Sequence, residues 1–455
     1  MNEVSPYTNA VIPPDDDGKL VIERKPLKLS PLDDSRNLRV LLQLIFAYES
    51  LLDEYALKQS LSATLSDQYF WPLTGRLMEN KENELVIDWD SNDENVGKVP
   101  FIAAVFRGSE TVRQLFSSRQ PEEFQNWNFF WNDHPLKTTN YTGIHGPLLA
   151  VQFTKFENGS GCVLGVQLHH CLADARSFYN FMNCWSTLNK NETPLIKPLN
   201  SRIIQFTSSP STDISLTNHS EYLLLPTKPG VSPIARTTLA ETTIRMFHFS
   251  KEYLTRLKSM VQAKVPNEKL STNSVLTAHI WQKVTNVRQV NENEITLLGF
   301  TMDIRQRVKP AMDQSYFGNA VIYAMASVHQ SNDLSLEQLA NTVQQVTSST
   351  EQSTRVSSTL EFLNYHHHQG NLSRIFIGWK PFYGNDLFLS SWTQLSMYNA
   401  GEFEHGRRPI FVGFPFSPFT DGIGILCRSS LEDGSIDLFL GLRKDHMKNL
   451  NLYEI

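Results

Sequence analysis

The feature that most constrains the fold is a pair of apolar runs joined by a glycine-rich turn. Residues 148–156 read LLAVQFTKF and residues 162–170 read CVLGVQLHH, with ENGSG between them. Two such runs around a Gly-containing loop predict a β-hairpin. Asp174 follows, and apolar residues then recur every three or four positions, which predicts an amphipathic helix. A hairpin that leads directly into a helix indicates a mixed α/β fold.

Helices and strands alternate along the rest of the chain, and hairpins are frequent. This pattern favours a mixed α/β sandwich over a doubly wound parallel sheet. The expected elements are a helical region over residues 39–65, a Ser- or Thr-capped helix over 271–288, strands within 294–308 and 315–328, and a helical polar region over about 334–368.

The length of the chain indicates two domains. At 455 residues it is too long for one ordinary core. From about residue 201 to 240 the composition shifts to Ser, Thr, Pro and Asn, which is typical of a linker. We therefore expect an N-terminal domain over residues 1–205, a crossover over 206–240 and a C-terminal domain over 241–455.

Composition limits the partners of the protein. The net charge is −6 and the pI about 6.1, so there is no general basic field for nucleic acid. No apolar run approaches the length that spans a bilayer. The four cysteines show no metal-ligand spacing, and the acidic, Pro-rich start has no apolar signal-peptide core. We expect a cytoplasmic monomer with no metal, no membrane anchor and no nucleic-acid partner.

His170 is the first candidate for chemistry. If the strand continues to its last residue, His170 lies on the same face as Cys162, Leu164, Val166 and Leu168. An imidazole at the end of such an apolar face could serve as a base, and the alternative is a buried structural histidine. With 13 His and 47 acidic residues, a His-x-x-x-acid match is also expected by accident.

Asp174 has two possible roles. It can cap the helix that follows, which Asp does well. It can also form an ion pair that fixes the direction of His170. The segment 301–305 reads TMDIR, and in a strand Thr301, Asp303 and Arg305 share one face. Arg offers a planar, two-pronged donor for such a buried carboxylate.

Five segments in order resemble the BAHD acyl-CoA-dependent acyltransferase family. The resemblance extends from LKLSPLD at 27–33 to GLRKDHM at 441–447, and LFLSSWTQLSMY…RRPIF is particularly similar to the fungal trichothecene acetyltransferase branch. The five segments are YFWPLTGRL at 69–77, HHCLADA at 169–175, STNSVLTAHIWQKVTNVR at 271–288, TMDIRQRVKP…YFGN at 301–319 and SSWTQL…Y at 390–398.

The resemblance implies a fold and a reaction. The fold would be α/β, with two chloramphenicol-acetyltransferase-like mixed-sheet domains and a channel between them. Acyl-CoA would enter from one mouth as a co-substrate and the acceptor from the other, without a further cofactor. The implied site comprises His170 as general base, Asp174 as a structural carboxylate paired with Arg305, Asp303 and Asn319 as support, and Ser390 and Trp392 as oxyanion donors.

One loop departs from the family pattern. The segment EFEHG at 402–406 stands where the family has DFGWG, so Glu402 takes the place of its Asp in a structural role. Arg407 and Arg408 follow and are candidate contacts for the CoA phosphates, or else plain surface residues. The trio His366–His368 is expected to be a solvated cluster at a helix end.

The predicted function is acyl transfer from acyl-CoA to an alcohol of a small-molecule acceptor, with no covalent enzyme intermediate. Three alternatives stay open. The acceptor could be an amine or polyamine, the protein could be a free-standing relative of the condensation domains that share the H-H-x-x-x-D core, or the fold could serve a non-catalytic binding protein.

Overall fold

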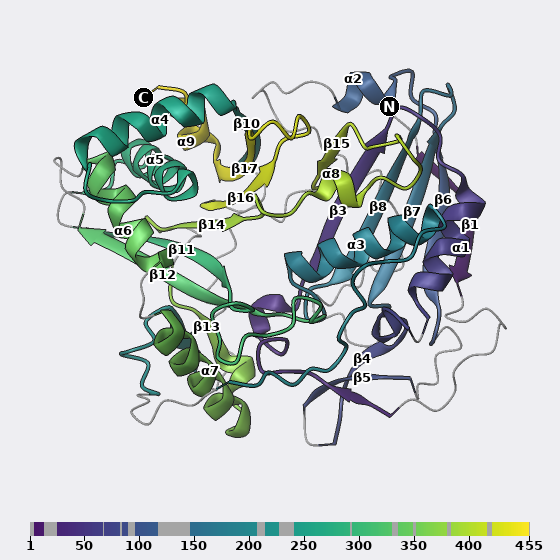
Figure 1. Ribbon diagram of the computed structural model, residues 1–455, viewed down its shortest axis with the longest axis horizontal. Coiled ribbons are helices and arrows are strands. Elements are labelled where there is room, and N and C mark those ends of the chain that lie inside the picture. The colour runs from purple at the N-terminus through teal and green to yellow at the C-terminus, as the bar shows by residue number, and fades with distance from the viewer. Residues whose placement is uncertain are drawn as a thin grey trace.

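Two sheet-and-helix halves lie side by side in the computed structural model (Figure 1). The structure describes residues 4–12, 25–66, 68–81, 84–89, 96–116, 146–206, 214–226, 241–291, 294–329, 335–348, 352–379, 384–415 and 421–454.

The predicted hairpin forms the middle of the first sheet. β7 (Leu149–Phe156) pairs antiparallel with β8 (Cys162–His169), and β8 is buried along its whole length. Gly161 in the turn has φ +141°, and a Cβ there would lie 1.9 Å from the Tyr48 carbonyl oxygen. Within the described residues the sheet runs β1 (Val4–Ile12), β6 (Val99–Phe106), β7, β8, β3 (Leu41–Tyr48) and β15 (Phe411–Gly413).

The predicted helical region over residues 39–65 is wrong in its first part. Residues 41–48 form β3, and α1 (Glu54–Thr64) begins only after Asp53 caps it. β3 lies between β8 and β15, and most of its side chains are buried on both faces. A strand buried on both faces is a continuous apolar run without alternation, so its periodicity cannot distinguish it from a helix.

Two helices pack on this sheet. The predicted helix after Asp174 is α3 (Ala175–Asn189), which crosses the sheet beside α1. Trp185 is fully buried between them, and its indole N–H donates to the Leu57 carbonyl and the Ser60 hydroxyl. A short helix, α2 (Val112–Phe116), lies near the end of β3.

The second half repeats the plan. The predicted helix over 271–288 is confirmed as α5 (Thr272–Val287), with the Ser271 hydroxyl accepting from the Ser274 amide. α4 (Lys251–Lys264) and α6 (Leu336–Ser348) pack against it. The described sheet runs β10 (Thr242–Phe249), β17 (Ile436–Arg443), β16 (Ile423–Arg428), β14 (Leu387–Ser391), β11 (Ile295–Asp303) and β12 (Val321–His329), with α9 (Lys444–Asn449) after it.

The crossover contains ordered structure. β9 (Tyr222–Leu224) pairs with β13 (Ile375–Ile377), and Glu221 forms a 2.9 Å ion pair with Arg355 on α7 (Gln352–His368). Within the described ranges, the remaining elements are the short helix α8 (Met397–Ala400), a small sheet of β2 (Leu27–Lys28), β5 (Leu85–Asp88) and β4 (Arg76–Glu79), and the 3₁₀ turns Arg36–Leu38, Trp71–Thr74 and Leu372–Arg374.

One segment of the second half belongs to the first. β15 pairs antiparallel with β3, and the Tyr48 hydroxyl donates to the Gly401 carbonyl at 2.8 Å. Residues from Trp392 to Phe414 pack in the core of the first half. The expected assignment of all of 241–455 to one domain therefore needs correction, because its stretch 392–414 crosses back to the N-terminal sheet.

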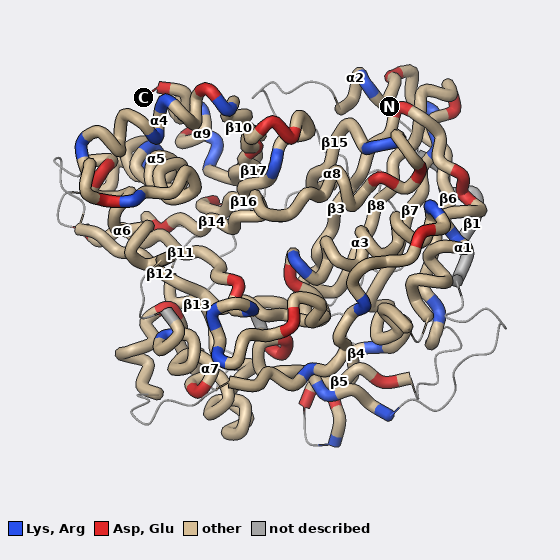
Figure 2. The backbone as a smooth tube through the Cα atoms, viewed as in Figure 1, with Lys and Arg blue, Asp and Glu red and all other residues tan. Residues whose placement is uncertain are grey.

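Charge is distributed rather than concentrated. Acidic and basic positions are interspersed over both halves (Figure 2). Every helix within the described ranges is too short or too polar to cross a bilayer.

Candidate active site

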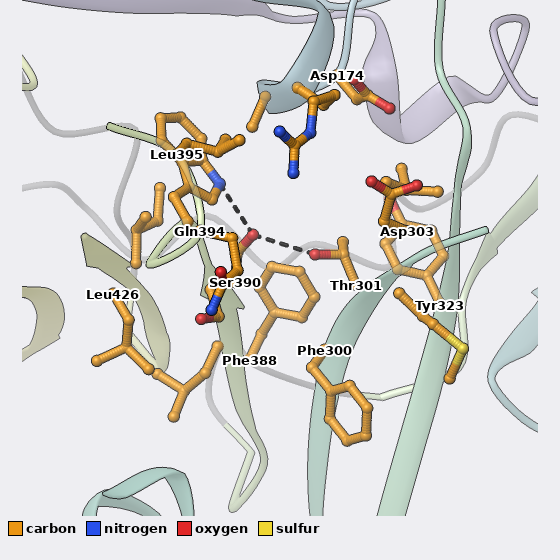
Figure 3. A pocket seen from close by; sticks show the side chains of 18 of the residues that line it. Asp174, Phe300, Thr301, Asp303, Tyr323, Phe388, Ser390, Gln394, Leu395 and Leu426 are labelled. Carbon is orange, nitrogen blue, oxygen red and sulfur yellow. Dashed lines mark hydrogen bonds between the residues drawn. The ribbon is translucent and has the colours of Figure 1, made fainter. Parts of the chain in front are cut away.

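A cavity of about 740 Å³ lies between the two halves. Its walls come from the start of β3 and of α3 in the first half, and from α5, α6, β11 and β14 in the second. Figure 3 shows part of it, with Asp174 and Asp303 on one side and Ser390 and Leu426 on the other. The cavity thus joins segments that are far apart in the sequence.

His170 lines this cavity directly after β8 ends. Its backbone N–H donates to the Val40 carbonyl at 2.9 Å, and the following turn is closed by the Leu172 amide on the His169 carbonyl. The residue is half-buried, and its Nδ1 atom is buried. Burial lowers the pKa of His170, although its own backbone, the Asp174 charge and the Asn319 side chain oppose the shift. The imidazole is therefore neutral near pH 7 and able to accept a proton.

Asp174 performs both of the roles considered from the sequence. Its Oδ1 caps α3 by accepting from the Ser177 amide at 2.8 Å. Both carboxylate oxygens also bind the Arg305 guanidinium, at 2.8 and 3.1 Å, and Oδ2 accepts from the Ala320 amide. Burial raises the pKa of Asp174, but the Arg305 charge and these hydrogen bonds outweigh burial and hold the pKa below its usual value. The carboxylate is a fixed, ionised brace.

Arg305 lies just beyond the strand predicted to carry it. β11 ends at Asp303, whose carboxylate accepts from the Arg305 amide at 2.9 Å and from its guanidinium at 3.3 Å. Arg305 is fully buried, and its guanidinium also donates to the Tyr316 and Gly318 carbonyls. Burial lowers the pKa of Arg305, but the two carboxylates raise it above its usual value. The ionic bracing expected here is present, although it is made from a turn rather than a strand face.

Asn319 supports His170 from the other side. Its side-chain amide donates to the His170 carbonyl at 2.8 Å and to the Asp33 carboxylate at 3.0 Å. Asp33 is fully buried, and it also accepts from the Asn319 and Ser30 backbone amides and from Arg202. The sequence analysis did not single out Asp33. The available signal was the turn SPLD, in which Ser30 and Asp33 bond to each other over three residues.

Ser390 and Trp392 lie on the wall of the cavity opposite His170. β14 pairs parallel with β11, which brings Ser390 next to Thr301 with hydroxyl oxygens 3.1 Å apart. The Trp392 indole N–H donates to the Ser390 hydroxyl at 3.1 Å. The expectation that hydroxyl and indole both point at a substrate oxygen is therefore modified: the indole N–H donates to Ser390, and either hydroxyl can be the donor in the Ser390–Thr301 bond.

The EFEHG loop lies outside the cavity lining. Glu402 accepts from the Gly406 amide at 3.0 Å and lies 4.0 Å from Arg408. Arg407 pairs with Glu404 at 2.6 Å, and Arg408 pairs with Glu432. Both arginines are exposed and engaged in ion pairs rather than placed beside His170. Their predicted contact with CoA gains no support from this arrangement.

The His366–His368 trio is at the end of α7, as expected. The expectation of a solvated cluster is wrong for His366, which is buried with its ring packed against Phe362. In the described part of the chain, no group of three or more His, Cys, Asp or Glu side chains is arranged to hold a metal ion.

The matches to known proteins show the family to which the chain belongs. The family model described as "Transferase family" matches residues 7–452. The chain belongs to this family, the BAHD acyl-CoA-dependent acyltransferases. It is therefore an enzyme, and the alternative of a non-catalytic binding protein is set aside.

Sequence relatives of this BAHD acyltransferase act on both oxygen and nitrogen. The hydroxycinnamoyl-CoA:5-hydroxyanthranilate N-hydroxycinnamoyltransferase of Avena sativa is 28% identical over 407 residues, covering 88% of this chain and 86% of that protein. The shikimate O-hydroxycinnamoyltransferase of Nicotiana tabacum is 26% identical over 405 residues, covering 88% and 87%. Membership thus establishes acyl transfer and leaves the acceptor atom open.

Solved structures confirm the two-domain BAHD fold. F. graminearum TRI101 with coenzyme A and T-2 mycotoxin has a TM-score of 0.76 at 16% identity, covering 94% of this chain and 97% of that one. Vinorine synthase has a TM-score of 0.68 at 19% identity, covering 99% and 97%.

Proposed function

We propose that this BAHD acyltransferase moves an acyl group from acyl-CoA to a hydroxyl group of a small-molecule, secondary-metabolite acceptor. The observation that carries the proposal is a neutral imidazole at one wall of the cavity and a hydroxyl donor at the other. In this arrangement His170 is the general base, and Ser390 and Trp392 form the oxyanion side.

In the proposed reaction, one proton moves from the acceptor hydroxyl to His170 and then from His170 to the leaving thiolate. His170 removes the proton of the acceptor hydroxyl as its oxygen bonds to the thioester carbon. The carbonyl oxygen becomes negative and accepts from the Ser390 hydroxyl. When the carbon–sulfur bond breaks, the imidazolium returns its proton to the CoA thiolate. No enzyme nucleophile takes part, so no covalent enzyme intermediate forms. A positioned base is worth about 10²–10⁴-fold in such a step.

The bracing around His170 suits this role. Asp174 contacts Arg305 rather than the imidazole, so it fixes the loop without competing for the proton. Asn319 holds the His170 carbonyl in place from the other half of the molecule. Both contacts fix the backbone that carries the ring, which matters because catalysis requires the reacting atoms to be closely aligned.

An alcohol is favoured over an aliphatic amine as acceptor. The cavity lining contains Asp174 and Asp303, which both pair with Arg305, and also Arg176, which has no acidic partner among the described residues. A guanidinium in the lining without a paired carboxylate disfavours a protonated amine. An aromatic amine, which is neutral near pH 7, is the second candidate, because the Avena sativa relative is named as an N-transferase.

Finer assignments rest on the sequence alone. The similarity of LFLSSWTQLSMY…RRPIF to the trichothecene acetyltransferase branch supports a place in that branch, as a proposal. A cytoplasmic location and a monomeric state are also proposed from the sequence alone.

A thiol-release assay tests the proposed function. The purified protein is incubated with acetyl-, malonyl-, p-coumaroyl- and long-chain acyl-CoA against hydroxylated and amino acceptors, and the products are identified by mass spectrometry. We expect acceptor-dependent release of CoA thiol and an ester product. If only amide products form, the acceptor is an amine and not an alcohol. Release of CoA thiol without any acylated product would contradict acyl transfer to an acceptor.

A further inference from the structure

Arg176 is a cation in the cavity that the reaction scheme above does not use. It is the second residue of α3, two residues after Asp174, and it lines the same cavity as His170. Its Nε atom is buried without a hydrogen-bond partner among the described residues. The guanidinium carbon lies 6.0 Å from the centre of the Tyr179 ring, which favours a fixed orientation of the side chain.

Within the described ranges, no carboxylate pairs with the Arg176 guanidinium. The two acidic side chains of the cavity, Asp174 and Asp303, are both bound to Arg305. Arg176 forms no ion pair with any residue in the described ranges. An arginine that is half-buried and lacks an acidic partner is left to bind an anion from outside the protein.

Helix stability does not explain an arginine at this position. The first turn of a helix carries the positive end of the helix dipole, where acidic residues are favoured and cations are not. The first turn of α3 contains no acidic residue, and Asp174 at its cap is already committed to Arg305. Arg176 therefore lowers the stability of the first turn of α3, and this cost indicates that the residue has a role in binding.

We propose that Arg176 binds a carboxylate group of the acceptor, so that the substrate is a hydroxylated organic acid. This inference rests on the proposed function, because it places the acid group beside the hydroxyl that His170 deprotonates. The phosphates of acyl-CoA are a less suitable ligand. They are separated from the thioester by the whole pantetheine arm, whereas Arg176 lines the same cavity as His170, where the proposed reaction takes place.

Other polar side chains of the cavity are compatible with such a ligand. Gln306 and Gln314 line the same cavity, and amide N–H groups donate to carboxylate oxygens without adding charge. The guanidinium itself offers a planar fork of donors, which matches a carboxylate better than a single hydroxyl.

Direct binding tests the charge preference without turnover. Calorimetric titration compares cinnamate with cinnamamide, a neutral analogue of the same shape, for the wild type and the variants Arg176→Gln and Arg176→Lys. We expect the wild type to prefer the acid roughly 10- to 100-fold, Arg176→Gln to lose that preference, and Arg176→Lys to keep part of it. Arg113→Gln, an exposed arginine outside the cavity, is the matched control and should behave as the wild type. Equal affinities, no binding of either compound, or a preference that survives in Arg176→Gln would overturn the proposal.

Kinetics then identify which substrate carries the anion. Acetyl-CoA serves as donor, so that the acyl group has no carboxylate, and shikimate is compared with its methyl ester. We expect Arg176→Gln to raise KM for the acid at least tenfold, with KM for acetyl-CoA and turnover of the ester unchanged. A rise confined to KM for acetyl-CoA would assign Arg176 to a CoA phosphate and overturn the acceptor assignment. If the wild type shows no acyl transfer at all, the proposed function is contradicted. The calorimetric result does not depend on turnover and still tests the charge preference of Arg176.

Discussion

The two walls of the cavity are held in place by different forces. The His170 wall is braced by buried charges: Arg305 binds Asp174 and Asp303, and Asp33 anchors Asn319. The Ser390 wall is held by neutral hydrogen bonds from Trp392 and with Thr301.

In the proposed reaction, both walls need preorganised groups. A base needs one fixed direction, and a buried ion pair with two parallel bonds allows very little movement. An oxyanion site needs a donor that is already aimed at the oxygen on which charge develops. The bonds of the Ser390 hydroxyl with Trp392 and Thr301 hold that group in place without adding a formal charge.

Replacing the base should have the largest effect. His170→Ala is expected to reduce acyl transfer about 10²–10⁴-fold, because the acceptor hydroxyl then loses its proton to water alone. The far-ultraviolet circular dichroism and thermal unfolding should stay close to wild type. The exposed His329→Ala serves as control. Near-normal turnover of His170→Ala would show that the His170 wall does not supply the base.

Breaking the charged brace should mainly reduce stability. Arg305→Met leaves the buried Asp174 carboxylate without a partner and should cost about 3–5 kcal/mol of unfolding free energy by urea titration. The double variant Asp174→Asn/Arg305→Met should recover part of that loss, since neither charge remains. Arg443→Met, which breaks an exposed pair with Asp445, should cost less than about 1 kcal/mol.

The same brace gives a pH dependence of known sign. The pKa of Asp174 is lowered in the folded state, so its contribution is complete above its unfolded pKa of about 3.9 and is lost as the pH falls through the folded value. The stability advantage of the wild type over Asp174→Asn should therefore disappear only in strong acid. An advantage that grows on acidification would contradict an ionised brace.

Removing the donor on the neutral wall should affect catalysis rather than stability. Ser390→Ala is expected to raise the activation free energy by about 2.7–4 kcal/mol, seen as a fall in kcat with little change in KM. Ser391 on the same strand bonds to Asn273 and Thr393, and Ser391→Ala should have a much smaller effect. A larger effect at Ser391 would move the oxyanion site to that hydroxyl.

A smaller effect is expected at Thr301, which contacts Ser390 rather than the reacting atoms. Thr301→Val removes the hydroxyl next to Ser390 and should cost about 0.5–1.5 kcal/mol in kcat, because the Ser390 proton loses its orienting partner. Thr301→Ser should restore the activity. If valine and serine behave alike, Thr301 contributes packing alone.

The smallest effect is a displacement of the pH–rate profile. Burial lowers the pKa of His170 below its usual 6.5, so activity that requires the neutral imidazole should fall only at a pH below that value. The measurement is kcat/KM for the acceptor against pH. An acid limb with its midpoint above 6.5 would mean that the Asp174 charge outweighs burial.

Local elements were predictable from the sequence because their signals are local. The turn, the helix caps at Asp174 and Ser271 and the helical periodicity of α3 are short-range patterns that the structure reproduces. β3 was predicted wrongly because a strand buried on both faces carries no alternation.

Long-range parts of the site were only partly predictable. Family resemblance identified His170, Asp174 and Arg305, which the structure brings together across the two halves. Asp33 was missed because a carboxylate near the start of a chain is usually solvated, and only its bonds to Asn319 and Arg202 show that it is buried. Arg176 was missed because a helix face shows which residues are polar and not which of them lack a partner.

The return of β15 to the first sheet has a practical consequence for anyone dividing this enzyme. A fragment that stops at the crossover would leave β3 as a bare edge, with the apolar run Leu41–Tyr48 open to pairing with other chains. Such a fragment should precipitate unless residues 392–414 are supplied with it. The same strand also holds the two halves together, because β15 pairs with β3 of the first half while the chain on either side of residues 392–414 belongs to the second.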